Sequence, residues 1–180
     1  MNTFVIFLRA VNVSGKNLIK MAELKDVLAN ASFTNVQTYI QSGNIILNSS
    51  LSAAATEKEV ASLIKKQFNH DVTTFVLTEE QLKNALKSSP FATDLPGNQV
   101  FITFLSDPIE KSLRDEINVL KYLPEEFHCD DQVVYFYLPD GAANAKLSNN
   151  FFEKKLKINA TGRNVNTVKK MLDLLAASKN

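Results

Sequence analysis

Residues 4–8 of the chain read FVIFL, and residues 101–105 repeat the pattern as FITFL. A continuous apolar run of this length is typical of a central strand that other elements cover. The elements predicted after each run follow the same order, which strengthens the match between the two runs. We therefore expect an internal duplication of one structural unit.

The first copy is predicted from apolar spacing and from helix-capping signals. Thr56 and Thr78 each open a capping box, in which a Thr and a Glu or Gln three residues later cap a helix start. The predicted elements are a strand at 4–8, a helix at 20–32, strands at 36–40 and 45–48, a helix opening at 56, a strand at 72–77, and a helix from 78 that stops before residue 90.

The second copy carries its own signals in the same order. Asp107 is expected to cap a helix whose first turn holds Pro108. The predicted elements are a strand at 101–105, that helix, strands near 127–129 and 133–138, a helix near 149–155, a short strand at 157–160, and a last helix bearing Val168, Met171, Leu172 and Leu175 on one face.

The order βαββαβ folds most simply as a ferredoxin-like layer, an antiparallel sheet with two helices on one face. We therefore predict an α+β protein with two tandem ferredoxin-like halves, each with an extra helix. The halves are expected at 1–91 and 98–180, with a joint at 92–97, and they could also pack as one compact unit. In this topology the loop after the first strand and the hairpin between the next two strands lie at the same end of the sheet.

Composition excludes several classes of protein. The 180 residues hold 20 Lys and Arg against 19 Asp and Glu, for a net charge of +1. A balanced charge argues against bulk attraction to nucleic acid or to an anionic membrane. The single Cys excludes a disulfide scaffold. A membrane-spanning helix needs a run of about 18 apolar residues, and the sequence has none of that length. The single Cys, with no export signal at the N-terminus, predicts a cytoplasmic protein.

The loop after the first strand is the first candidate site, with Arg9, Asn12, Gly15, Lys16 and Asn17. Such a loop can direct backbone N–H groups at an anion, with Gly allowing close approach and Lys adding charge. It imitates a nucleotide-binding P-loop poorly, because Ala10 replaces the leading Gly and Asn17 replaces the Ser or Thr that holds magnesium. A structural loop, with Asn12 and Asn17 capping turns, is the alternative.

The predicted hairpin is the second candidate segment, and it contains Gln41, Ser42 and Asn44. Its turn requires Gly43 in a positive-φ conformation. The amides there could recognise a ligand or tie the two loops together.

The third segment precedes the last helix and contains Arg163, Asn164 and Asn166. Asn164 or Asn166 is expected to cap that helix. Arg163 at a helix start opposes the macrodipole unless it faces a carboxylate or a phosphate, so a ligand partner and an internal partner both stay open.

Three motifs in this order resemble the family called domain of unknown function 1697 (DUF 1697). They read RxxNxxGKN from residue 9, TYIQSGN from residue 38 and TxRNxNTV from residue 161, and KLSN from residue 146 also matches. The departures are Ala10 and Ser14, where the family usually has Gly, and Val165, where it usually has Trp. The family consists of soluble, mostly bacterial proteins without an established activity, so the resemblance implies a soluble protein and gives no reaction.

Metal and catalytic sites have little support in the sequence. His70 and His128 show no metal-ligand spacing, and the segment from His128 to Asp131 is typical of a solvated turn. No catalytic residue, metal or cofactor is predicted.

The leading hypothesis is a binding module for a phosphate-bearing ligand, either a nucleotide or a nucleic-acid segment. In it Arg9, Lys16 and Arg163 contact phosphate, and Asn12, Gln41 and Asn44 give selectivity. The alternatives are an enzyme on a phosphorylated or nucleotide substrate, with Asp130 or Asp131 as a carboxylate from the other half, and a structural protein whose motifs only dock the halves. A monomer or weak dimer is expected.

Overall fold

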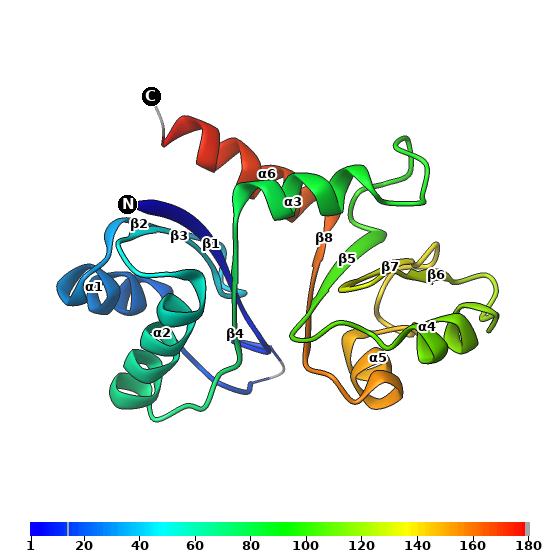
Figure 1. Cartoon of the computed structure of the whole chain (residues 1–180), viewed down its shortest axis with the longest axis horizontal. Coiled ribbons are helices and arrows are strands. Elements are labelled where there is room, and N and C mark those ends of the chain that lie inside the picture. Colours follow the sequence, from blue (N-terminus) through cyan, green and yellow to red (C-terminus); the bar gives the residue numbers. More distant parts are fainter. Residues whose placement is uncertain (14, 179–180) are drawn as a thin grey trace. The chain divides into compact units, whose positions relative to one another are not determined.

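The computed structural model describes residues 1–13 and 15–178, and it contains two four-stranded antiparallel sheets with their helices (Figure 1). The chain divides into two compact units. The first unit comprises Met1–Leu82 and the C-terminal residues from Met171, and the second comprises Lys83–Lys170. No helix within the described ranges is long and apolar enough to cross a membrane.

The first sheet has the strand order β2-β3-β1-β4, which is the ferredoxin-like order. Its elements are β1 (Asn2–Leu8), α1 (Met21–Ala31), β2 (Thr34–Tyr39), β3 (Asn44–Ser49), α2 (Ala53–Phe68) and β4 (Thr74–Leu77), followed by the extra helix α3 (Glu79–Lys87). Helices α1 and α2 contribute Leu24, Leu28 and Ile64 to a core that also contains Ile6 and Leu8 of β1.

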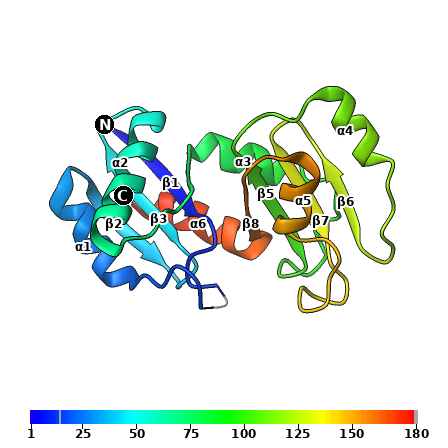
Figure 2. The same cartoon turned by 90° about the horizontal axis from the view of Figure 1, so that it is seen from below.

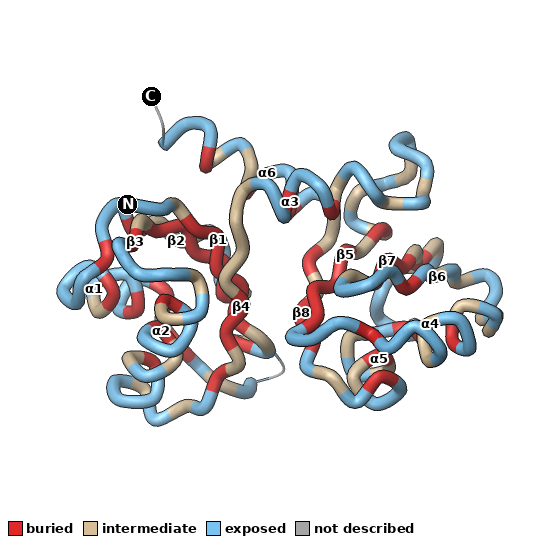
Figure 3. The backbone as a smooth tube through the Cα atoms, viewed as in Figure 1, coloured by how far each residue is buried: buried red, intermediate tan, exposed pale blue. Residues whose placement is uncertain are grey.

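Strand β1 is buried from Phe4 to Leu8 without interruption, and Figure 3 colours most of this strand as buried. Phe4, Ile6 and Leu8 belong to the core beneath the helices. Val5 and Phe7 alternate with them and are fully buried as well. Because successive side chains of a strand point to opposite faces, burial of both faces produces the continuous FVIFL run instead of an apolar-polar alternation.

The second sheet repeats the topology with the order β6-β7-β5-β8. Its elements are β5 (Val100–Leu105), α4 (Lys111–Asn118), β6 (Glu126–Cys129), β7 (Val133–Tyr137), α5 (Asn149–Leu156) and β8 (Ala160–Asn164), followed by the extra helix α6 (Val165–Ala177). Ile117 of α4 and Phe152 of α5 pack with Phe136 of β7 in its core. The predicted α+β fold with two tandem ferredoxin-like halves is confirmed.

One of the two predicted capping boxes is present and the other is not. Thr78 and Gln81 cap α3 reciprocally, since the Thr78 N–H donates to Gln81 Oε1 at 2.8 Å and the Gln81 N–H donates to Thr78 Oγ1 at 3.2 Å. Helix α2 begins three residues before Thr56, and Ser52 is its cap. Thr56 is instead buried, and its hydroxyl donates to Ser49 Oγ at 3.0 Å.

The second half departs from the prediction at two places. Helix α4 begins at Lys111, and the Asp107 carboxylate accepts a hydrogen bond from the Ser106 hydroxyl at 2.7 Å instead of capping it. The last strand is β8, not residues 157–160. Lys157 has φ +57 and ends α5 in the left-handed conformation, so the chain reaches the sheet only at Ala160.

Candidate functional site

The loop after β1 and the β2–β3 hairpin meet at one end of the first sheet, as the topology predicts (Figure 2). The Leu8 N–H donates to the Gly43 carbonyl at 2.9 Å, which places the hairpin beside the end of β1. The Arg9 N–H donates to the Thr73 carbonyl at 2.9 Å on the other side of β1. The two candidate loops of the first unit therefore form one continuous surface region.

Asn12 holds this region together with its side-chain amide. Its Nδ2 donates to the carbonyls of Ile19 and Gln41, both at 2.8 Å, and its Oδ1 accepts from the Ile19 N–H at 2.8 Å. Asn12 has φ +55, a conformation that Asn tolerates better than most residues. The amide thus joins the two ends of the first loop to the hairpin. The sequence pattern suggests such a tie through the amides of Gln41 and Asn44, whereas the structure makes it with the Asn12 amide and the Gln41 carbonyl.

The hairpin is held by Asn44 and Gly43. Asn44 is fully buried, and its Nδ2 donates to the Tyr39 carbonyl at 3.1 Å and to Ser42 Oγ at 3.0 Å. Gly43 has φ +75, as predicted, and a Cβ at this position would lie 2.7 Å from Leu8 Cβ. Gly is therefore required at position 43 for its conformation and for its close approach to β1.

The tip of the first loop presents hydrogen-bond donors. Gly15 has φ +74 and open space around it, and Lys16 is exposed beside it. Within the described residues, the backbone N–H groups of Ala10, Gly15 and Asn17 donate no hydrogen bond. Ser14, one of the departures from the family pattern, lies outside the described residues. Exposed N–H groups beside a Lys ammonium are the donor set that suits an anion.

The remaining residues of the two loops have different environments. Arg9 is half-buried at the end of β1. Asn17 donates from Nδ2 to the Ala10 carbonyl at 3.2 Å, which closes the tip of the loop. Gln41 is exposed, while Ser42 is half-buried and accepts the Asn44 hydrogen bond.

Arg163 lies in the second unit, on β8, opposite Ile102 of β5. It is buried, and its Nη1 donates to Thr161 Oγ1 at 3.0 Å and to the Gly162 carbonyl at 2.9 Å. Burial lowers the pKa of the guanidinium to about 10, so Arg163 is still charged at neutral pH.

Two Asn residues follow at the junction of β8 and α6. Asn164 Oδ1 accepts from the Thr167 N–H at 2.9 Å, so Asn164 is the helix cap that the sequence predicted as one of two choices. Asn166 is exposed, and its N–H donates to the Gly97 carbonyl at 3.4 Å. Both residues belong to the second unit, as Arg163 does.

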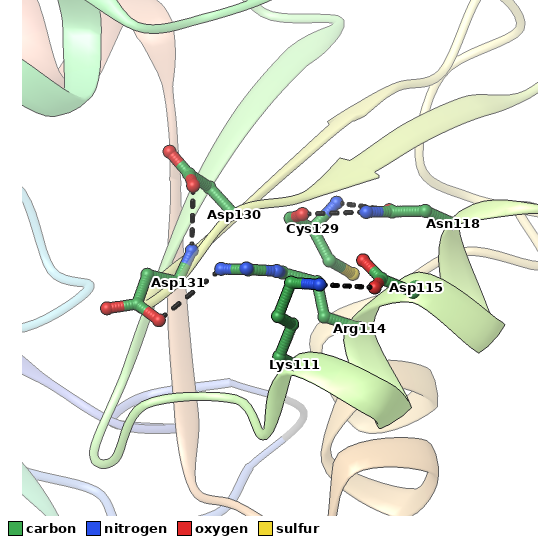
Figure 4. A network of polar contacts seen from close by, with 7 residues as sticks. All are labelled: Lys111, Arg114, Asp115, Asn118, Cys129, Asp130 and Asp131. Atoms are coloured by element: carbon green, nitrogen blue, oxygen red, sulfur yellow. Dashed lines mark hydrogen bonds and ion pairs between the residues drawn. The ribbon is translucent and has the colours of Figure 1, made fainter.

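A polar network surrounds the hairpin of the second sheet (Figure 4). Asn118 brackets the backbone of Cys129, donating to its carbonyl at 2.8 Å and accepting its N–H at 2.7 Å. Arg114 pairs with Asp131 at 3.4 Å, and the Asp131 N–H donates to the Asp130 carboxylate at 2.8 Å. These contacts are those of a capped, solvated turn. No three His, Cys, Asp or Glu side chains in the described part of the chain form a group that could hold a metal ion.

Sequence reasoning missed a carboxylate that organises the second unit. Glu125 accepts from the Lys146 N–H at 2.8 Å and from the Leu147 N–H at 2.7 Å, one with each oxygen. The segment of Lys146 and Leu147 belongs to the family-like motif, and its backbone is thus bound internally. A Glu more than twenty residues earlier in the chain carries no sequence signal for this role.

The comparisons with known proteins agree with the fold. A family model described as "Protein of unknown function (DUF1697)" matches residues 1–135. No curated protein matches the chain. The conserved bacterial protein SP0830 from Streptococcus pneumoniae has a similar structure, with a TM-score of 0.70, 20% sequence identity, and coverage of 96% of this chain and 98% of that one.

Proposed function

The chain belongs to the DUF1697 family, whose function is unknown, and we propose that its first unit is a binding module for a phosphate-bearing ligand, a nucleotide or a nucleic-acid segment. The ligand binds at the loops of residues 9–17 and 41–44. The observation that carries the proposal is the tip of the first loop, where Lys16 and unbonded N–H groups stand together at an exposed positive-φ Gly.

The residues divide into those that shape the site and those that contact the ligand. Asn12 and Asn44 use their amides for internal hydrogen bonds, so they hold the loops in place. Lys16 and the Gly15 N–H bind phosphate by charge and hydrogen bonding. Gln41 has an exposed amide that offers both a donor and an acceptor for selectivity.

Binding is favoured over catalysis because of what the two loops contain. Residues 9–17 and 41–44 hold amides and cations, but no His, Asp or Glu that could move a proton. We also propose a cytoplasmic setting in a bacterium. The single Cys129 is buried and unpaired, which suits a reducing compartment, and the similar structure comes from a bacterium.

A structural role for the motifs is the second candidate, and a specific observation favours it. The Asn12 amide makes three internal hydrogen bonds that join the two loops, which is what a purely structural motif would require. The two candidates differ at Lys16, because an exposed Lys at a loop tip contributes little to stability.

The test is isothermal titration of the full chain with AMP and with inorganic phosphate, compared across three proteins. We expect Lys16→Ala to weaken binding about tenfold, because it removes one charge-assisted contact. Lys25→Ala, which removes an exposed Lys from α1 of the same unit, is the matched control and should bind as the wild type does. Absence of binding, or equal affinity of the Lys16→Ala and Lys25→Ala proteins, contradicts the proposal.

A further inference from the structure

Three apolar side chains around the candidate site are exposed to solvent. Val13, Leu18 and Ile40 are 52%, 66% and 51% exposed, respectively. A soluble protein tolerates scattered exposed apolar side chains, but a group of them beside a polar site marks a place where a ligand is covered. We call these three side chains the apolar rim.

The Asn12 hydrogen bonds bring the segments of the rim together. Val13 follows Asn12 directly, Leu18 precedes the Ile19 that exchanges two hydrogen bonds with the Asn12 amide, and Ile40 precedes the Gln41 whose carbonyl accepts the third. Each rim residue is therefore the direct neighbour in the chain of a residue in the hydrogen-bonded cluster of Asn12, Ile19 and Gln41.

Lys16 belongs to the same neighbourhood as the rim. It pairs with Val13 in an isolated β-bridge, and its N–H donates to the Val13 carbonyl at 3.0 Å. A cation and an apolar side chain thus share one short turn. The site combines groups for phosphate with groups for an apolar surface.

Ile40 is held in an unusual backbone conformation. Its φ is +49, in the left-handed region that β-branched residues rarely occupy. About half of Ile40 stays exposed, so burial of its side chain offsets the cost of that conformation only in part. Strain of this kind concentrates at ligand sites, where the side chain is held for use.

From these observations we infer that the ligand is a mononucleotide, whose base packs on the apolar rim while its phosphate binds the Lys16 loop. The inference rests on the proposed function and names the class of ligand that the site binds. The exposed Gln41 amide stands beside Ile40 and can pair with the donor and acceptor edge of a base. The net charge of +1 favours a single nucleotide over a long polyanion.

The test compares ligands that share a phosphate and differ in the base. AMP, ribose 5-phosphate and inorganic phosphate are titrated into the full chain. We expect AMP to bind about tenfold more tightly than ribose 5-phosphate, the gain from covering roughly 60 Å² of apolar surface. In a Leu18→Ala and Ile40→Ala double variant the ratio should fall below about threefold, with ribose 5-phosphate unchanged.

Leu51→Ala provides the matched control. Leu51 is an exposed apolar residue of the same unit that follows the opposite end of β3, and its removal should leave the ratio at the wild-type value. Equal affinity for AMP and ribose 5-phosphate in the wild type overturns the inference and leaves the proposed function standing. Loss of ribose 5-phosphate binding in the double variant also overturns it, because the rim would then shape the loop only. No binding of any of the three ligands overturns the proposed function itself.

Discussion

The two halves of the chain end their central strands with equivalent hydrogen bonds. In the first half the Leu8 N–H donates to the carbonyl of Gly43 in the hairpin at 2.9 Å, and in the second the Leu105 N–H donates to the carbonyl of Gln132 at 3.1 Å. The next residues match as well. The Arg9 N–H donates to the Thr73 carbonyl and the Ser106 N–H donates to the Asn159 carbonyl, both at 2.9 Å, and each acceptor directly precedes the fourth strand of its half. The halves therefore share a frame to the level of single backbone contacts.

The loops that leave this frame differ in length and in charge. Residues 9–20 separate β1 from α1, while only residues 106–110 separate β5 from α4. The first loop carries Arg9, Lys16 and Lys20 and no acidic residue, whereas residues 106–110 carry Asp107 and Glu110 and no basic residue. The candidate anion site therefore depends on the long loop of the first half, and not on the ferredoxin-like fold that both halves share.

The largest expected effect tests the contact between hairpin and strand. Gly43→Ala should lower the free energy of unfolding by about 3 kcal/mol, because the new Cβ meets Leu8 Cβ at 2.7 Å and the backbone has φ +75. Gly15→Ala shares the positive φ without any crowding and should cost about 1 kcal/mol. Chemical denaturation measures both. Equal losses would mean that close packing at Gly43 does not set its requirement for Gly.

The next prediction concerns the Asn12 amide, whose hydrogen bonds join the first loop to the hairpin, and Asn12→Ala removes them. We expect a loss of about 2 kcal/mol in the free energy of unfolding, since the backbone groups of Ile19 lose their amide partner. In the second half a backbone hydrogen bond joins the corresponding loop to its hairpin, from the Ile109 N–H to the Asp131 carbonyl at 2.7 Å. Asn30→Ala, at an exposed position of α1, is the control and should change stability by less than about 0.5 kcal/mol. A loss for Asn12→Ala no larger than this control refutes the role of the amide.

A smaller expected effect is a dependence of stability on alkaline pH that arises in the second half. Burial raises the pKa of the Cys129 thiol to about 12 from an ordinary value near 9, and it raises the pKa of Tyr135 to about 12; both residues lie in the second unit. Above pH 9 the unfolded thiol ionises while the folded thiol keeps its proton, so stability present below pH 9 is lost as pH rises.

We expect the Cys129 contribution to fall by about 1.4 kcal/mol between pH 8 and pH 10. Urea denaturation at the two pH values should show a smaller alkaline loss for Cys129→Ala than for the wild type. An identical pH dependence of the two proteins would contradict burial of the thiol as its cause.

The fold could be predicted because its signals are local and repeated. The FVIFL and FITFL runs, the Thr78 capping box and the turn at Gly43 each depend on neighbouring residues. Strand β8 could not be predicted at its observed position, because Gly162 and Arg163 have weak strand signals. They join the sheet by pairing with Thr103 and Ile102 of β5. Tertiary pairing decides such a strand.

The meeting of the two candidate loops could be predicted from the sequence, whereas the hydrogen-bond partners of their side chains could not. The topology alone brings residues 9–17 to the hairpin at residues 41–44. The sequence could not tell that the Asn12 amide points to Ile19 and Gln41, since Asn suits a ligand contact and a loop contact equally. Nor could it tell that Ile40 is exposed, because an apolar residue in a β-prone run is expected to be buried.

The comparison of the halves is tested most directly by titrating AMP into isotopically labelled protein and following every backbone amide by NMR. The first loop and the second-half loop are then observed in one experiment. The account predicts that the amide signals of Ala10, Gly15, Lys16 and Asn17 shift with AMP concentration while those of residues 106–110 keep their positions. Shifts of equal size in both loops, or no shift in residues 9–17, would contradict an anion site confined to the first half.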